Sequence, residues 1–202
     1  MRDIVKRYIE GLEQAYDNNG GREQWEEFVN VKEGASSEQI QRIKELFPEV
    51  PESLLELLQY ADGTYYRAYG NTNICLYFLG SNLEEYPYYL LSSEQIIENE
   101  TLAQSWYGDY VDRDFDPEEI PIDDRIIDDA SKMKWLHFSD CMNNGGTSQL
   151  FLDFSPSESG VSGQVVMFVH DSDRLEVIAN SFDEYLENMI KWEYDFIQED
   201  LF

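Results

Sequence analysis

The sequence predicts an α+β fold with a central, mostly antiparallel sheet and helices packed against it. Apolar residues recur at helical spacing through roughly the first sixty residues and again near the C-terminus. Between about 135 and 179, short β-prone runs alternate with turn residues instead. With 202 residues and 42% hydrophobic content, the chain can bury one sizeable core, so we expect a single domain over residues 1–202.

The first thirty-three residues are predicted to form a helical extension. Residues 2–17 carry one apolar stripe at helical spacing, and Asn18-Asn19-Gly20-Gly21 ends it because Asn and Gly accept the left-handed conformation. A short second helix follows around Trp25 and Phe28. The extension therefore covers residues 1–33.

A pair of helices comes next. Ser36 and Gln39 have the spacing of a capping box, which predicts a helix that Pro48 closes. Pro51 suits the first turn of the following Leu-rich helix, and Asp62-Gly63 ends that helix. We expect this hairpin to cover one face of the sheet.

Strands are predicted at 73–79 and 88–91, and Ser92 with Gln95 predicts a capped helix that runs to about Trp106. Farther along, strands are expected at 135–138, 148–154, 164–170 and 175–179. A tight turn is predicted at 143–146, and a final helix from Phe182.

Residues 109–129 are acidic and irregular, and only Arg113 and Arg125 oppose their carboxylates. Pro117 and Pro121 break any long helix there, so we expect a long exposed insertion. It is either a solvated loop or a surface for a basic partner, and the candidate contacts are Asp112, Asp114, Asp116, Glu118, Glu119, Asp123 and Asp124.

A calcium loop is not expected in this segment. Its acids have the spacing of an EF-hand from Asp112, but Pro117 stands where a sharp turn needs Gly, and Asp123 stands where a longer Glu is needed. His137 and His170 lie alone on predicted strands, so no zinc site is expected, and we predict no cofactor.

The loop after the strand at 148–154 contains Asp153, Pro156, Gly160 and Gly163. Turn chemistry accounts for each: the Asp accepts hydrogen bonds from loop N–H groups, the Pro fixes a turn and the Gly residues allow positive φ. We interpret this loop as structural, with presentation to a partner as the alternative.

Several tyrosines have two possible roles. They could offer ring faces to Arg and Lys of a partner, or they could flank strands and pack. The residues concerned are Tyr65, Tyr66, Tyr69 and Tyr88.

Two motif blocks resemble the SUKH superfamily of the Smi/Knr type. The opening block comprises Gly34–Ile40 and Pro51–Gly63, and the closing block comprises Leu152–Val165 and Ile178–Leu186. Together they span about residues 34–190. The resemblance implies an α+β fold; bacterial members of this superfamily are mostly taken to be immunity proteins that neutralise polymorphic toxins, and fungal relatives are regulators of cell-wall assembly.

The charge balance bears on partners. The chain has 42 acidic and 14 basic residues, a formal net charge of −28. This argues against nucleic acids and anionic membranes and favours a basic protein, although solubility alone also explains it. The N-terminus lacks a secretory signal, no run is long enough to span a bilayer, and the cysteines Cys75 and Cys141 suggest reduced thiols, so we expect a cytoplasmic protein.

These observations and the resemblance lead us to expect an immunity protein without catalytic activity. Its acidic face would cover the basic cleft of a toxin, and we expect a toxin that acts on nucleic acid. The alternative is a regulatory scaffold of the Smi/Knr type without a toxin. A third hypothesis is a metal-assisted hydrolase that uses the carboxylates of 109–129. The oligomeric state is left open.

Overall fold

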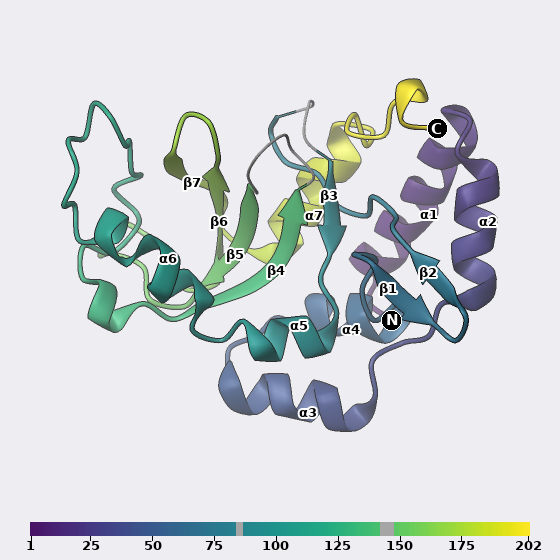
Figure 1. Cartoon of the computed structure of the whole chain (residues 1–202), viewed down its shortest axis with the longest axis horizontal. Helices are drawn as coiled ribbons and strands as arrows, with labels where there is room; N and C mark the ends of the chain where they lie inside the picture. The colour runs from purple at the N-terminus through teal and green to yellow at the C-terminus, as the bar shows by residue number, and fades with distance from the viewer. Residues whose placement is uncertain (84–86, 142–147) are drawn as a thin grey trace.

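The computed structural model describes residues 1–83, 87–141 and 148–202 (Figure 1). It confirms the α+β prediction, with a five-stranded antiparallel sheet in the order β3-β4-β5-β6-β7 and a separate β1–β2 hairpin. The strands are β1 (Arg67–Tyr69), β2 (Thr72–Ile74), β3 (Tyr88–Leu90), β4 (Trp135–Cys141), β5 (Gln149–Asp153), β6 (Gln164–Val169) and β7 (Arg174–Ala179).

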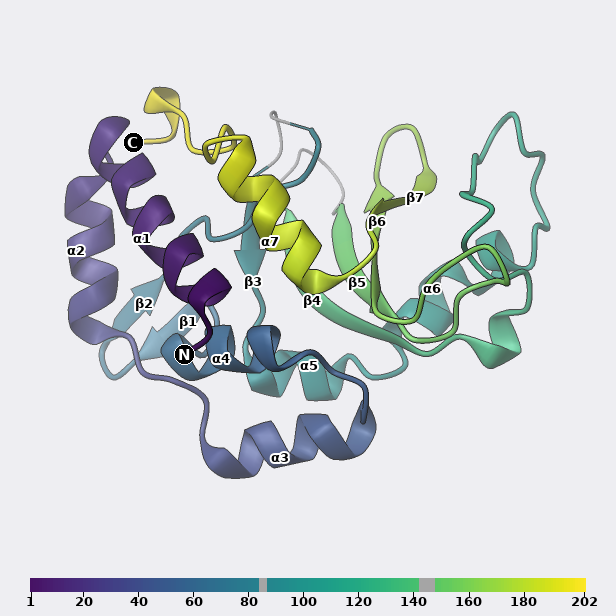
Figure 2. The same cartoon turned by 180° about the vertical axis from the view of Figure 1, so that it is seen from behind.

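Helices flank both faces of the sheet. Helices α5 and α6 lie on the face turned to the viewer in Figure 1, and α1 and α7 lie on the opposite face, seen in Figure 2. The helices are α1 (Asp3–Asn18), α2 (Arg22–Val31), α3 (Ser37–Leu46), α4 (Glu52–Tyr60), α5 (Ser93–Glu98), α6 (Leu102–Val111) and α7 (Phe182–Lys191), with short 3-10 turns η1 (Ala130–Lys132) and η2 (Glu199–Leu201). No helix in the described ranges is both long and apolar enough to cross a bilayer.

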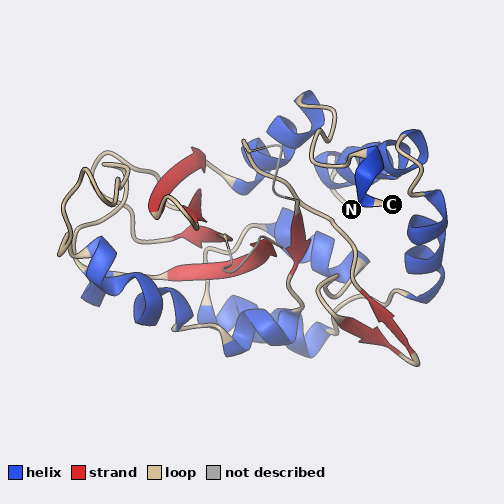
Figure 3. Ribbon diagram, turned by 45° about the horizontal axis from the view of Figure 1, so that its top comes forward, coloured by secondary structure: helices blue, strands red, loops and turns tan. Residues whose placement is uncertain are grey.

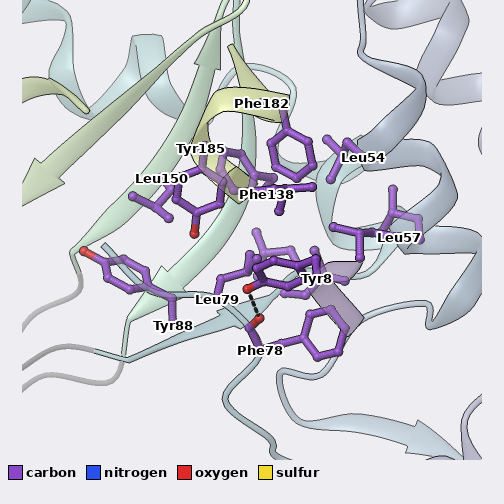
Figure 4. Packing of buried hydrophobic residues seen from close by; sticks show 14 of the residues in the cluster. Tyr8, Leu54, Leu57, Phe78, Leu79, Tyr88, Phe138, Leu150, Phe182 and Tyr185 are labelled. Carbon is purple, nitrogen blue, oxygen red and sulfur yellow. Dashed lines mark hydrogen bonds between the residues drawn. The ribbon is translucent and has the colours of Figure 1, made fainter. Parts of the chain in front are cut away.

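The larger core lies between the sheet and α1, α4 and α7. Tyr8, Leu54, Phe138 and Phe182 meet there with almost no exposed surface (Figure 4). A smaller core on the other face joins the buried side of α6, including Tyr107, to the sheet. The N-terminal extension is part of the larger core, since α1 packs on α7.

Two sequence-based boundaries are corrected. The predicted strand at 73–79 ends at Ile74, and the segment rejoins the sheet at its far end, where an isolated bridge pairs Leu79 with Tyr88 and the Phe78 N–H also donates to the Tyr88 carbonyl. The reason is that tyrosines of α1 occupy its carbonyls: Tyr8 Oη donates to the Phe78 carbonyl at 2.7 Å (Figure 4), and Tyr16 Oη donates to that of Tyr77 at 2.7 Å.

The predicted helix from Ser92 to about Trp106 is two helices. α5 begins with the expected Ser92–Gln95 capping box but ends at Glu98. The side-chain amide of Asn99 lies 3.0 Å from Nδ1 of His137 on β4, and the chain turns there before α6 begins at Leu102. The Ser36–Gln39 box also forms as predicted, whereas the predicted turn at 143–146 lies outside the described residues.

Candidate partner-binding surface

The acidic segment after α6 divides into two parts with different environments. We call residues 114–119 the acidic tip. Its carboxylates are exposed, and none of them forms an ion pair with a basic residue in the described ranges. Asp116 Oδ1 accepts a hydrogen bond from the Glu118 N–H at 2.9 Å, so part of the tip is held in a local turn. The tip, at the end of the molecule opposite the two termini, is mostly loop (Figure 3).

Residues 121–126 form what we call the edge clamp. The Leu175 N–H donates to the Pro121 carbonyl at 3.1 Å, and the Asp123 N–H donates to the Leu175 carbonyl at 3.0 Å. These bonds run along the outer edge of β7, which would otherwise offer unpaired groups. The prediction of an exposed loop over 109–129 is therefore wrong for this part, and Ile126 is buried in the smaller core.

Asp123 and Arg125 fix the clamp to the strand. Arg125 bonds both carboxylate oxygens, at 2.9 Å from Nε and 2.5 Å from Nη2, and Nη2 also donates to the Val177 carbonyl at 3.0 Å. Burial raises the pKa of Asp123, but the hydrogen bonds from Arg125 and from the backbone N–H groups outweigh burial and lower it to about 2. The carboxylate of Asp123 is thus occupied, which corrects its prediction as a partner contact.

The remaining predicted acids lie in mixed positions. Asp112 Oδ1 accepts a hydrogen bond from the Ala130 N–H at 2.6 Å and so positions η1, whereas Asp124 is exposed. Of the seven acidic candidates, the structure gathers four on the tip, namely Asp114, Asp116, Glu118 and Glu119.

The loop 153–163 docks against the clamp. Asp153 is fully buried and accepts bonds from the Ser155 N–H at 2.7 Å and from Gln164 Nε2 at 2.9 Å, while burial raises its pKa. A Cβ at Gly160 would lie 2.5 Å from the Arg125 carbonyl oxygen, and Gly163 has φ of +85°. Pro156 precedes Ser157, whose N–H donates to the same Arg125 carbonyl at 3.0 Å.

The tyrosine candidates divide between core and surface. Tyr69 is 5% exposed and donates to the Gly63 carbonyl, and Tyr88 is 0% exposed, so partner contact is wrong for both because neither ring reaches the surface. Tyr65 is half-buried and stacks on Tyr89 at 4.9 Å between ring centroids.

Tyr66 is the exposed member of this set. It is 71% exposed and has φ of +47°, a conformation that bulky residues seldom adopt. Tyr65 and Tyr66 directly precede β1, which lies at the opposite end of the molecule from the tip (Figure 1). The structure therefore does not bring the two groups of predicted contacts together.

The Asp62-Gly63 pair of the opening motif has a structural explanation. Asp62 is buried, pairs with Arg67 at 2.7 Å and accepts the Ser93 N–H at the start of α5 at 2.7 Å. Gly63 has φ of +91°, and a Cβ there would lie 2.7 Å from the Ser92 nitrogen. This pair joins α4 to α5.

Among the described residues, no group of three or more His, Cys, Asp and Glu side chains is placed to hold a metal ion. His137 is buried, and its Nε2 bonds Asp140 Oδ1 at 2.8 Å. Burial raises the pKa of Cys141 to about 12, so this thiol stays protonated near neutral pH and is a poor nucleophile.

Sequence reasoning missed two exposed aromatic residues, one on α6 and one within the tip. Trp106 is 60% exposed on α6, and Phe115 is 42% exposed within the tip itself. The available signal was the spacing of α6, where apolar residues occupy two neighbouring stripes while one stripe is enough to pack on a sheet.

No curated protein matches the chain. The model of the SMI1 / KNR4 family (SUKH-1) matches residues 34–188, which is well over half of the sequence and includes both motif blocks, the sheet and most of α7. The match begins immediately after the N-terminal helical extension. The chain therefore belongs to the SMI1 / KNR4 family (SUKH-1).

Proposed function

We propose that this chain is an immunity protein that binds a basic toxin in the cytoplasm and neutralises it by covering its active cleft, without breaking any bond itself. The acidic tip is the observation that carries the proposal. Its four carboxylates lack cationic partners within the described parts of the chain, so they are free to pair with a partner. A toxin that acts on nucleic acid fits best, because carboxylates can take the place of phosphates in its cleft.

The net charge supports the same partner. At −28, the chain attracts a basic protein over distances of about a Debye length, which is roughly 8 Å at physiological salt. The exposed tip would make the first contact with the partner, because it lies at one extremity of the molecule (Figure 1).

Strand addition at a sheet edge is not the proposed mode of binding. The clamp covers β7, and on β3 the Leu90 carbonyl accepts the Thr64 N–H at 2.8 Å while the Tyr88 N–H donates to Leu79 at 2.8 Å. Both outer strands of the five-stranded sheet thus already have backbone partners, which favours recognition by side chains, above all by the carboxylates.

The proposed cytoplasmic location rests on the thiols. Neither Cys75 nor Cys141 forms a disulfide, which suits a reducing compartment.

The test is binding to the toxin domain encoded beside this gene. We expect a tight complex that abolishes the toxin's activity, with an association rate that falls on the order of ten-fold between about 50 and about 500 mM salt. A toxin domain from an unrelated gene neighbourhood serves as the control. Absence of a neighbouring toxin, or a neighbouring toxin that stays active and unbound, would overturn the proposal.

A further inference from the structure

Helix α6 has more apolar surface than its packing requires. Ala103, Tyr107 and Val111 form the buried stripe that rests on the smaller core. Trp106 and Tyr110 lie on the adjacent stripe, one turn apart and therefore on the same side of the helix. This second stripe is only partly covered, and Trp106 is its most exposed member.

The second stripe continues into the acidic tip. The Phe115 ring stands edge-on to the Tyr110 ring, with 5.2 Å between centroids. Tyr110 is fixed in turn, because its hydroxyl donates to Asp173 Oδ2 at 2.9 Å in the β6–β7 turn. Trp106, one turn before Tyr110 on α6, and the contacting pair Tyr110 and Phe115 make up an aromatic strip, which we call the α6 strip.

Carboxylates border the α6 strip. Asp109 precedes Tyr110 on the helix, Asp114 and Asp116 flank Phe115, and Asp173 bonds the Tyr110 hydroxyl. The basic residue nearest in sequence does not compensate them. Arg113 donates to the Val111 and Ile126 carbonyls, both at 3.3 Å, and so its guanidinium is directed into the fold.

We propose that the α6 strip is the docking site for an arginine-bearing segment of the basic partner. A guanidinium lies flat on an indole ring and pairs with neighbouring carboxylates in the same geometry, a combination that a lysine ammonium provides less well. An anionic membrane or a nucleic acid would be repelled by the same carboxylates. The natural occupant rests on the proposed function, but the recognition chemistry can be tested without the toxin.

The four tryptophans provide a direct readout. In a proton–nitrogen NMR correlation spectrum of the nitrogen-15-labelled chain, each indole N–H gives one signal. Single Trp→Phe variants assign the four signals. Trp25 and Trp135 are buried internal controls, and Trp192, exposed at the end of α7, is the matched control for a solvent-facing indole. The probe is an octa-arginine peptide, compared with octa-lysine at the same concentration.

We expect octa-arginine to shift the Trp106 signal at low peptide concentration, before any change at Trp192, and octa-lysine to shift it less. Trp106→Ala should weaken octa-arginine binding about three-fold, whereas Trp192→Ala leaves it unchanged. Both side chains face solvent, so both variants should keep the wild-type unfolding midpoint.

Equal shifts at Trp106 and Trp192, equal shifts with the two peptides, or no shift at Trp106 would each overturn the inference. None of these outcomes decides whether the chain neutralises a toxin, which the toxin assay measures separately. Conversely, a selective shift at Trp106 with octa-arginine supports the α6 strip even if the neighbouring toxin proves to be a different partner.

Discussion

The two parts of the acidic segment have similar composition and opposite roles. In the edge clamp, Asp123 is held by Arg125 and by the N–H of Val177 on β7. In the acidic tip, four or more residues before Asp123, Asp114 and Glu119 have no basic partner in the described parts of the chain. The difference shows that the donors within reach, and not the residue type, decide whether a carboxylate stabilises the fold or remains available for binding.

The contrast also separates two uses of charge. A partly buried carboxylate with several donors contributes to folding, and its removal leaves those donors unsatisfied. An exposed carboxylate without donors contributes little to folding, but it adds to the field that a partner meets. Substitutions in the two parts should therefore affect different measurements.

The largest effect is expected from Asp123→Ala. The change leaves the Arg125 guanidinium and the Val177 N–H without their acceptor at the sheet edge, and it should lower the free energy of unfolding by about 3 kcal/mol. Urea denaturation measures this loss. Asp114→Ala is the matched control in the tip, and a loss as large as that of Asp123→Ala would contradict the division of the segment.

Gly160→Ala should destabilise the protein by about 2 kcal/mol. The new Cβ would lie 2.5 Å from the Arg125 carbonyl oxygen, so the loop or the clamp would have to move. Gly163→Ala is the control, since it meets nothing within 4 Å and adds only the cost of its positive φ, about 1 kcal/mol. Thermal unfolding compares the stability losses of the two variants. Equal unfolding midpoints would show that Gly160 is not in close contact with the clamp.

The clamp should also respond to acid. The folded pKa of Asp123 is about 2, below its ordinary value of 3.8, so its stabilisation is present above about pH 4 and is lost as the pH falls towards 2. Asp123→Asn lacks this contribution. Its free energy of unfolding should therefore fall by about 1 kcal/mol less than that of the wild type over this window, a figure reduced for partial exposure of the pair. The measurement is the free energy of unfolding of wild type and variant at a series of pH values between about 4 and about 2. An equal fall in both proteins would refute the claim that Asp123 is responsible for this loss.

The smallest effect on stability is expected from neutralising the tip. Replacing Asp114, Asp116, Glu118 and Glu119 with Asn or Gln should change the free energy of unfolding by less than about 0.5 kcal/mol, because these side chains are exposed and unpaired within the described ranges. Urea denaturation again provides the measurement, and a cost above about 1 kcal/mol would show that the tip has a structural role.

Local patterns predicted much of this fold. Three kinds of feature depend on neighbours a few residues apart, and the structure has all of them. They are the capping boxes at Ser36 and Ser92, the amphipathic first helix and the strands from 135 onwards. Motifs with a fixed order and spacing likewise indicated the family that the match over residues 34–188 confirms.

The features that escaped prediction depend on contacts between distant residues. The strand at 73–79 is cut short because Tyr8, 70 residues away, donates to the Phe78 carbonyl. The clamp forms because Arg125 reaches Val177, 52 residues farther along. Arg125 stands two residues after Asp123, but nothing in a window around 109–129 shows that this pair meets β7, so the sequence indicated one acidic surface where the structure has a tip and a clamp.

The most direct test of the account is the association rate with the neighbouring toxin domain for two charge-matched variants at low and high salt. One variant neutralises Asp114 and Asp116 in the tip, and the other replaces Glu23 and Glu27 with Gln on α2, at the far end of the molecule (Figure 2). We predict that the tip variant associates several-fold more slowly at low salt and loses part of its salt dependence, whereas the α2 variant stays close to the wild type. Equal rates for the two variants, with tight binding retained in both, would contradict the claim that the unpaired carboxylates of the tip guide the partner.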